Sequence, residues 1–302
     1  MHTTLRQMKV FQVVAEQLNY TRAARELHLS QPAVSMQVKQ LEDAVGLPLF
    51  EHTGKKIQLT EAGREIYQYA RTLFQTFEEM EEVIAAMKGL GTGHLNIAVA
   101  STVNYFAPRL LAAFSRDYPG IDLHLDVANR ERLIGLLKAN EIDIVLMGLP
   151  PEDIELEYEP FMENPLVVIA PPGHRLQHEK KIPASRLSEE VFLLREAGSG
   201  TRLAMERYFS EQSIDITTGM QMTRNEAIKQ AVRAGMGLGV VSTHTIELEV
   251  ETGRLVILDV EGFPLKRHWY MVYRKGKRLS PAAKAFHDFV LAEAQHVRDA
   301  PV

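Results

Sequence analysis

Residues 19–50 read NYTRAARELHLSQPAVSMQVKQLEDAVGLPLF, and this stretch decides how the first part of the chain folds. Asn19 or Thr21 can cap a short helix, because a polar side chain there accepts a hydrogen bond from a free backbone N–H group. Ser30 can cap the next helix, with Pro32 in its first turn, where a missing N–H group costs nothing. Two short helices joined by a tight turn are typical of a helix-turn-helix.

Further elements are predicted on both sides of this pair of helices. Apolar residues recur at helical spacing over residues 4–18, which predicts an amphipathic helix before the pair. The last of the three helices is expected to end at Gly46. Two short strands then bracket residues 53–56 (TGKK) as a small hairpin, or wing, with a basic tip. Residues 1–60 are therefore predicted to form a winged helix-turn-helix domain.

One long helical pattern follows the wing, over residues 62–88. Its apolar residues alternate between spacings of four and three, which is a heptad seam. The seam consists of Ile66, Ala70, Leu73, Phe77, Met80, Ile84 and Met87. A coiled coil with a second copy is the simplest way to bury it, and packing on its own domain is the alternative. We predict a dimerising linker over residues 61–92, with a hinge in the GLGTG stretch at 89–93, because a dinucleotide-binding loop would need the reverse order of strand and helix.

From His94 the pattern changes to alternating strands and helices. Strands are expected at 94–100, 121–127, 142–147, 165–170, 191–194, 238–242 and 267–273, and helices at 103–117, 130–139, 200–212, 224–235 and 281–297. This alternation predicts parallel α/β sheets covered by helices. We expect an effector-binding domain over residues 93–302 with a ligand cleft between two lobes. One lobe comprises residues 93–163 and 267–302, and the other residues 164–266.

Composition and charge restrict the class of protein. The chain has 302 residues and no cysteine, which excludes disulfides and thiolate metal sites within it. It contains neither an apolar run of the roughly 18 residues that a membrane helix needs nor a signal-peptide pattern, so we expect a cytoplasmic protein without a membrane partner. Residues 1–60 contain seven basic and five acidic side chains, a net charge of +2, whereas the whole chain carries −5. A mildly basic first domain suits contact with DNA.

Residues 19–50, together with the wing end LTEAG at 59–63, resemble the DNA-binding domain of LysR-type transcriptional regulators. The resemblance implies a multidomain fold: an all-α winged helix-turn-helix, a long linker helix and a two-lobed α/β effector domain similar to periplasmic binding proteins. The segments 198–202 (GSGTR) and 224–239 are most similar to the subgroup that activates carbon-fixation (RuBisCO) operons.

Contacts with DNA are predicted from the geometry of the motif, because the second helix of a helix-turn-helix enters the major groove with its N-terminus first. The predicted base contacts are Gln31, Pro32, Ala33, Ser35 and Met36. The predicted phosphate contacts are Thr21, Arg22, Lys39 and the wing lysines Lys55 and Lys56. Taken alone, residues 30–32 could be an ordinary helix cap. The family often has arginine at Met36 and His52, so base preference and phosphate anchoring are expected to differ.

Polar groups at strand ends and helix N-termini are predicted to line the effector cleft. The candidates are Ser101, Thr102, Asn104, Pro150, Ser199, Thr201, Arg202 and Asn225. The helix that begins after Gly198 offers free N–H groups, and an arginine grips a carboxylate or phosphate with two donors. We therefore expect a small anionic metabolite as effector and no other cofactor. Plain helix capping is the alternative role for the serine and threonine of this group.

The resemblance also implies partners and leaves rival functions to be weighed. A homodimer presents two DNA-binding domains related by a two-fold axis. The predicted target is therefore an inverted-repeat operator with half-sites about one helical turn, or a multiple, apart. Family members commonly form homotetramers, and RNA polymerase is a further partner of an activator. The alternatives are an effector-independent repressor, an enzyme, and a solute-binding module fused to a DNA-binding head. No motif of a hydrolase, zinc protease or nucleotide-binding loop occurs, so no catalytic or metal site is predicted.

Overall fold

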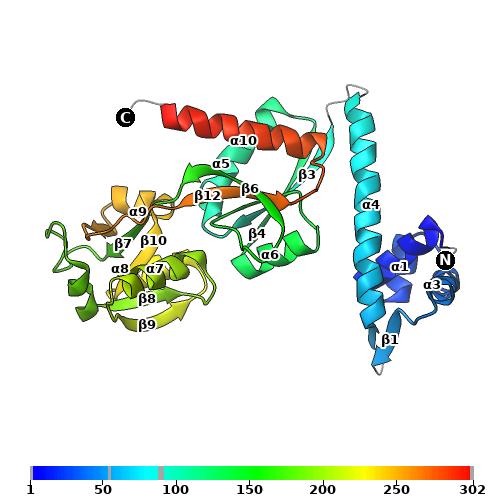
Figure 1. The fold of residues 1–302 in the computed structure, drawn as a ribbon, viewed down its shortest axis with the longest axis horizontal. Helices are drawn as coiled ribbons and strands as arrows, with labels where there is room; N and C mark the ends of the chain where they lie inside the picture. Colours follow the sequence, from blue (N-terminus) through cyan, green and yellow to red (C-terminus); the bar gives the residue numbers. More distant parts are fainter. Residues whose placement is uncertain (1–2, 54–55, 88–91, 300–302) are drawn as a thin grey trace. The chain divides into compact units, whose positions relative to one another are not determined.

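The computed structural model describes residues 3–53, 56–87 and 92–299 (Figure 1). It divides into two compact units, Met1–Met87 and Lys88–Val302. Most of the predicted hinge lies in residues 88–91, outside the described residues. Within the described ranges, no helix is both long and apolar enough to cross a membrane.

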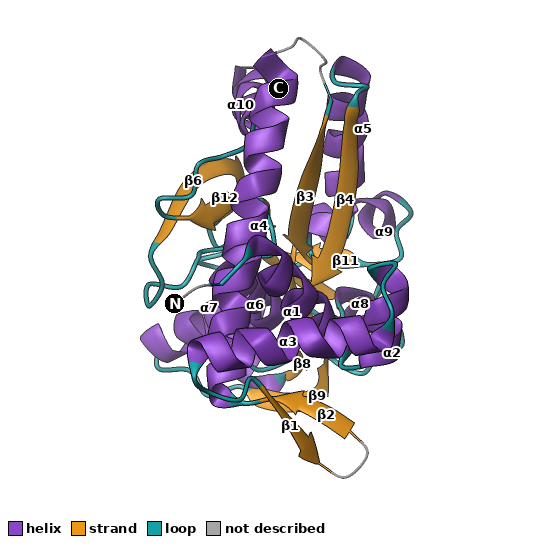
Figure 2. Ribbon diagram, turned by 90° about the vertical axis from the view of Figure 1, so that its right-hand side faces the viewer, coloured by secondary structure: helices purple, strands orange, loops and turns teal. Residues whose placement is uncertain are grey.

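The first unit contains every element predicted for residues 1–88. Its elements are α1 (Leu5–Gln17), α2 (Tyr20–Glu26), α3 (Gln31–Val45), β1 (Phe50–Thr53), β2 (Lys56–Leu59) and α4 (Glu61–Met87) (Figure 2). Asn19, rather than Thr21, caps α2 by accepting from the Arg22 N–H group. Ser30 caps α3, and Gly46 ends it with a positive φ of 79°. The winged helix-turn-helix fold is confirmed.

The wing is fixed to α3 through one carboxylate. Glu42 of α3 accepts hydrogen bonds from the N–H groups of Leu49 (2.8 Å) and Phe50 (3.3 Å), where the hairpin begins. The Phe50 ring in turn packs against Phe11 of α1, with ring centroids 5.4 Å apart. These contacts set the wing relative to α3, because the start of the hairpin is held by both polar and apolar groups.

The long helix α4 uses its two halves differently. Ala70 is fully buried in the core of the first unit, and Ile66 packs against the same core. Further along, Phe77, Met80 and Ile84 are 38%, 48% and 42% exposed. The amino-terminal half of the predicted seam therefore packs on its own domain, which was the alternative considered. The exposed seam, Phe77–Met80–Ile84, is left without a partner among the described residues.

The second unit contains two five-stranded sheets (Figure 1). The first has the order β4-β3-β5-β12-β6. Its strands are β3 (Gly93–Ala100), β4 (Ile121–Ala128), β5 (Ile144–Met147), β6 (Leu156–Glu163) and β12 (His268–Arg274). Helices α5 (Ala107–Asp117) and α10 (Pro281–Asp299) supply the core on one face, and α6 (Arg130–Lys138) supplies it on the other, as the two clusters around Phe114 and Leu133 show.

The second sheet has the order β11-β7-β10-β8-β9. Its strands are β7 (Leu166–Ala170), β8 (Val191–Arg195), β9 (Thr217–Met222), β10 (Leu238–Ser242) and β11 (Val256–Leu258). The helices of this half are α7 (Gly200–Glu211), α8 (Asn225–Arg233) and α9 (Glu247–Glu251), with short 3₁₀ segments at Val103–Tyr105, Ala184–Glu189 and Thr243–Thr245 in the unit as a whole. The chain crosses between the sheets twice, after β6 and before β12, so the two-sheet effector fold is confirmed.

The sheets, predicted to be parallel, are mixed. β12 runs antiparallel to β5 and β6, and β7 runs antiparallel to β10 and β11. Both β7 and β12 arrive from the other sheet instead of through a crossover helix over their own sheet, so nothing forces them to run parallel.

The three strands that the sequence pattern missed, β6, β9 and β11, all lie at sheet edges. The residues of β6 and β9 are largely exposed and lack a continuous apolar run, whereas β11 is apolar but only three residues long. β6 even contains Pro160, which faces Tyr270 beside a shift in register. A proline is tolerated in an edge strand or at a bulge because it lacks the donor that a central strand needs.

Gly63 at the start of α4 is required by close packing. A Cβ atom there would lie 2.0 Å from the carbonyl oxygen of Leu49. We expect Gly63→Ala to lower the free energy of unfolding of the first unit by about 2–4 kcal/mol, because the backbone at the wing must shift.

Gly135→Ala is the matched control. This glycine lies in α6, and a Cβ atom there has nothing within 4 Å, so alanine should leave stability unchanged or raise it by up to about 1 kcal/mol. Calorimetric unfolding of the full chain measures both variants. Equal melting of Gly63→Ala and the unchanged chain would contradict the close-packing argument.

Candidate functional site

The exposed face of α3 carries the residues predicted to contact bases. Val34 and Val38 are buried in the core, so the side chains between them turn outward. Gln31 and Pro32 are exposed, Met36 is 53% exposed, and Ala33 and Ser35 are partly buried. The Gln31 amide donates to the Ser35 hydroxyl at 2.8 Å, which orients two hydrogen-bonding groups side by side on this face.

The residues predicted to contact phosphates are described only in part. Thr21 and Arg22 are exposed on α2. Lys39 pairs with Asp43 at 3.1 Å, but both side chains are more than 60% exposed. An exposed ion pair contributes little free energy, so Lys39 can leave Asp43 and pair with a DNA phosphate instead. Lys55 lies outside the described residues, and so does the side chain of Lys56.

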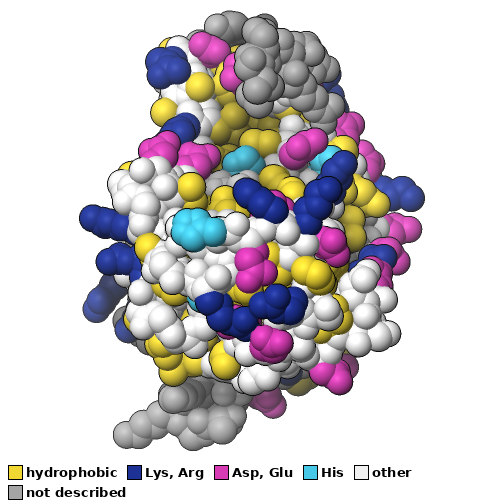
Figure 3. Space-filling model, turned by 90° about the vertical axis from the view of Figure 1, so that its left-hand side faces the viewer, with side chains coloured by type: hydrophobic (Ala, Val, Ile, Leu, Met, Phe, Trp, Pro, Cys, Tyr) yellow, Lys and Arg dark blue, Asp and Glu magenta, His cyan; other side chains and the backbone are white. Residues whose placement is uncertain are grey.

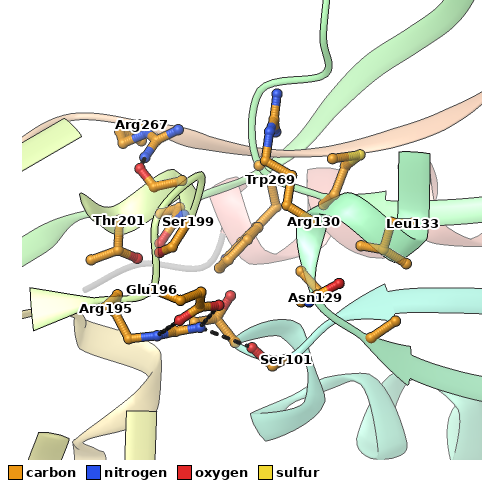
Figure 4. A pocket seen from close by; sticks show the side chains of 17 residues that line it. Ser101, Asn129, Arg130, Leu133, Arg195, Glu196, Ser199, Thr201, Arg267 and Trp269 are labelled. Atoms are coloured by element: carbon orange, nitrogen blue, oxygen red, sulfur yellow. Dashed lines mark hydrogen bonds and ion pairs between the residues drawn. The ribbon is translucent and has the colours of Figure 1, made fainter. Parts of the chain in front are cut away.

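A small cavity of about 50 Å³ lies within the second unit, between its two sheets (Figure 4). The parallel strands β3, β4 and β5 of the first sheet end at this cavity, and so do β8 and the N-terminus of α7. Its polar lining consists of Ser101, Thr102, Asn129, Arg130, Asn164, Arg195, Glu196, Ser199, Thr201, Arg267 and Trp269. Ligands in α/β proteins bind at such strand ends, because loops and helix N-termini converge there.

Four of the predicted effector contacts line this cavity: Ser101, Thr102, Ser199 and Thr201. Ser199 also caps α7 by accepting a hydrogen bond from the Arg202 N–H group. Helix capping, the alternative role considered for this serine, therefore occurs at a residue that also lines the cavity.

The other four predicted contacts, Asn104, Pro150, Arg202 and Asn225, are not among the lining residues. The guanidinium of Arg202 is instead engaged on α7 and β9, where it donates to Glu206 at 2.6 Å and to Gln221 at 2.8 Å. Asn225 lies behind the wall and accepts a hydrogen bond from Arg195.

The sequence analysis missed the two cations that dominate the cavity, Arg130 and Arg267. Arg130 donates to the carbonyl of Leu149 at 2.6 Å, and Arg267 donates to the carbonyl of Gly200. Neither makes an ion pair with a carboxylate of the described residues. Arg130 follows the predicted strand 121–127, so the strand-end rule that selected Ser101 would also have selected it.

The environment of these arginines opposes their charge. Burial lowers the pKa of Arg267 below its usual value, and the nearby positive charge of Arg130 lowers it further. Burial likewise lowers the pKa of Arg130, which Asp153 partly offsets. Both groups remain cations, since an arginine side chain stays protonated in proteins. The cavity wall therefore carries positive charge that an anion would stabilise.

A third arginine, Arg195, is neutralised internally. Its guanidinium forms two hydrogen bonds with Glu196, of 2.7 and 2.8 Å, and reaches Ser101 of the other lobe at 3.5 Å (Figure 4). Arg195 is only 6% exposed. This end of the cavity is polar but close to neutral.

Two buried polar atoms of cavity-lining residues have no hydrogen-bond partner in the described structure: Trp269 Nε1 and Asn164 Oδ1. Both residues are 3% exposed. An unpaired buried polar atom costs about 1–3 kcal/mol, so a ligand that supplies a partner for either would bind more tightly. The cavity can thus offer two cations, one free donor and one free acceptor to a small molecule.

The surface shown in Figure 3 contrasts with this interior. Lysine and arginine side chains on that face alternate with aspartate and glutamate. Mixed charge of this kind gives little directional attraction for an anion. In the cavity wall, Arg130 and Arg267 make no ion pair with a carboxylate of the described residues.

Comparison with known proteins identifies relatives of both units. A model described as "Bacterial regulatory helix-turn-helix protein, lysR family" matches residues 5–64, and one described as "LysR substrate binding domain" matches residues 88–295. A protein of Allochromatium vinosum named RuBisCO operon transcriptional regulator is 64% identical over 97% of each chain. The transcriptional activator CmpR of Synechocystis sp. is 44% identical over 100% of this chain and 99% of its own.

A solved structure resembles the second unit. It is the CcmR regulatory domain of Synechocystis in complex with 2-PG, which is 43% identical, with a TM-score of 0.66. The match covers 68% of this chain and 98% of the solved chain.

Trp269 provides a direct test of whether the cavity takes a ligand, because it is the only tryptophan of the chain. Binding of an anion should change its fluorescence, since its ring lines the cavity and its donor is free. Titration with inorganic phosphate measures this change, and Trp269→Phe is the control that should abolish it. Heat of binding without any change in emission would show that the ligand binds elsewhere.

Proposed function

The chain belongs to the LysR family of bacterial transcriptional regulators, and from this premise we propose that it regulates carbon-fixation genes in response to a small anionic metabolite bound between its two lobes. The resemblance to a RuBisCO operon regulator at 64% identity supports the choice of target genes. The observation that carries the effector proposal is the pair Arg130 and Arg267, which donate to backbone carbonyls and make no ion pair with a carboxylate of the described residues.

The chemistry of the cavity favours an anion over a neutral molecule. Two half-buried guanidinium groups use backbone carbonyls as their described partners, and burial opposes their charge. An anion would replace weak dipoles with a charge-assisted, two-pronged contact. Ser199 and Thr201 at the N-terminus of α7 add hydroxyl groups and the positive end of a helix dipole. The 2-PG complex of the CcmR domain supports a small ligand in a relative.

On the DNA side, we propose that α3 enters the major groove and reads bases with Gln31, Ser35 and Met36. The exposed seam of α4, Phe77–Met80–Ile84, would pair with a second copy, because its apolar side chains remain exposed among the described residues. A two-fold dimer then binds an inverted repeat. Pairing of dimers into tetramers and contact with RNA polymerase complete the proposed activator.

Regulation follows if the effector binds two arrangements of the lobes with different affinity. The cavity is lined by both lobes, through Ser101 and Arg130 on one side and Ser199 and Thr201 on the other. An anion that contacts both sides stabilises the closed arrangement relative to an open one. DNA binding that no metabolite changes would instead favour an effector-independent repressor.

The effector proposal predicts different results for two arginines. Arg267→Ala should weaken the binding of 2-PG or inorganic phosphate by about 10- to 100-fold, because a half-buried cation in the cavity wall is lost. Arg202→Ala should change affinity by less than about threefold, since the Arg202 guanidinium is engaged by Glu206 and Gln221. Calorimetric titration measures both. The reverse order of effects would refute the assignment of the anion to Arg267.

The DNA proposal predicts separate roles for a base contact and a phosphate contact. Gln31→Ala should weaken binding to duplexes selected by the full chain from a random pool by about tenfold, and spare nonspecific binding. Arg22→Ala should weaken binding to all duplexes and reduce the salt slope by about one. Fluorescence anisotropy at several salt concentrations measures both effects.

Gln230→Ala is the control, because this glutamine is exposed on α8 of the second unit and bonds to Glu226. Its affinity for DNA should equal that of the unchanged chain. If Gln31→Ala also leaves sequence preference unchanged, α3 does not read the bases as proposed.

A further inference from the structure

Glu196 carries the one carboxylate among the described residues that line the cavity. It lies in the cavity wall and receives two hydrogen bonds from Arg195, from Nε at 2.7 Å and from Nη2 at 2.8 Å (Figure 4). Two parallel bonds of this kind are how a guanidinium binds any carboxylate or phosphate. Glu196 therefore satisfies Arg195 in the way a ligand would.

The two partners of this ion pair differ in how firmly they are held. The Arg195 side chain is 5% exposed and donates also to Asn225. The Glu196 side chain is 17% exposed, and Arg195 supplies all its hydrogen bonds recorded in the described structure. The arginine is thus fixed by several groups, whereas the carboxylate depends on the arginine alone. If another anion replaced the Glu196 carboxylate on Arg195, the other contacts of Arg195 would remain in place.

The size of the cavity limits what binds while Glu196 stays in place. Its volume of about 50 Å³ corresponds to roughly three to five water-sized positions, at about 10–15 Å³ each. That is room for one phosphate- or carboxylate-sized group beside Arg130 and Arg267. A second anionic group on the same molecule would meet the like charge of Glu196 at the other end.

We propose that Glu196 is a built-in competitor of the effector, and that it yields its place on Arg195 to the second anionic group of a ligand that carries two. This inference rests on the effector site proposed above and specifies its selectivity. A ligand with one anionic group binds at Arg130 and Arg267 and leaves the Arg195–Glu196 pair closed. A ligand with two displaces Glu196 and spans from Arg267 to Arg195, so Glu196 sets the affinity for this second class.

The test compares two ligands of similar size on the full chain. Glycerol 3-phosphate carries one anionic group, and 3-phosphoglycerate carries a carboxylate in addition to its phosphate. Glu196→Gln should strengthen the binding of 3-phosphoglycerate about tenfold or more, because Arg195 loses its internal anion. Binding of glycerol 3-phosphate should change by less than about threefold. Calorimetric titration gives both constants, and their ratio is a readout that a merely structural role of Glu196 would not alter.

Three further variants make the result decisive. Glu206→Gln removes a carboxylate that pairs with Arg202 and does not line the cavity, so the ratio should not change. The double variant Arg195→Gln with Glu196→Gln should lose the gain, because the gain requires a free Arg195. Glu196→Asp keeps the charge on a shorter side chain and should give a smaller gain of the same sign, which covers the case in which Glu196→Gln does not fold.

The possible failures are distinguishable. The ratio that matters is the affinity for 3-phosphoglycerate divided by the affinity for glycerol 3-phosphate. If this ratio is unchanged or lower in Glu196→Gln and Glu196→Asp, while Arg267→Ala still binds weakly, the role of Glu196 is overturned and the effector site stands. Absence of binding of either ligand and of inorganic phosphate by the unchanged chain overturns both proposals.

Discussion

Partly buried positive charge that forms no ion pair, between the two sheets, is the constraint on which the effector domain depends. Arg130 and Arg267 are held by the carbonyls of Leu149 and Gly200, which are dipoles and not charges. Removing a cation from water without a counter-charge is unfavourable by several kcal/mol, so an anion placed at this junction would stabilise it. Arg195 avoids that cost through Glu196. Arg195 thus has an anion of the protein as its partner, whereas Arg130 and Arg267 could gain one only from a ligand.

The topology explains why these groups meet. β3, β4 and β5 are parallel and end at one edge, which presents Ser101 and Arg130 together. The chain then crosses to the second sheet, whose strand β8 and helix α7 deliver Arg195 and the cap at Ser199 to the same place. On its return it passes through Arg267 directly before β12. Two crossings thus bring residues from four distant segments to one small cavity.

Covalent continuity links this cavity to the DNA-binding unit. β3 carries Ser101 just beyond its carboxyl end, and its amino end begins shortly after α4 ends at Met87. α4 in turn shares the core of the winged helix-turn-helix through Ala70 and leaves the seam Phe77–Met80–Ile84 exposed. One strand and one helix, consecutive in the chain apart from residues 88–92, therefore connect the cavity to the exposed seam and to the unit that contains α3.

The sequence alone determined the winged helix-turn-helix, the long helix and the central strands, because caps such as Ser30, apolar periodicity and buried runs act locally. It also located Ser101, Thr102, Ser199 and Thr201 at strand and helix ends, where chain order suffices. It could not reveal the edge strands β6 and β9, which are exposed and lack an apolar run, the three-residue edge strand β11, or the antiparallel course of β12. Only the tertiary structure distinguished Arg202, paired with Glu206, from Arg130 and Arg267. Whether a charge is compensated depends on which distant side chains surround it, and local sequence does not encode that.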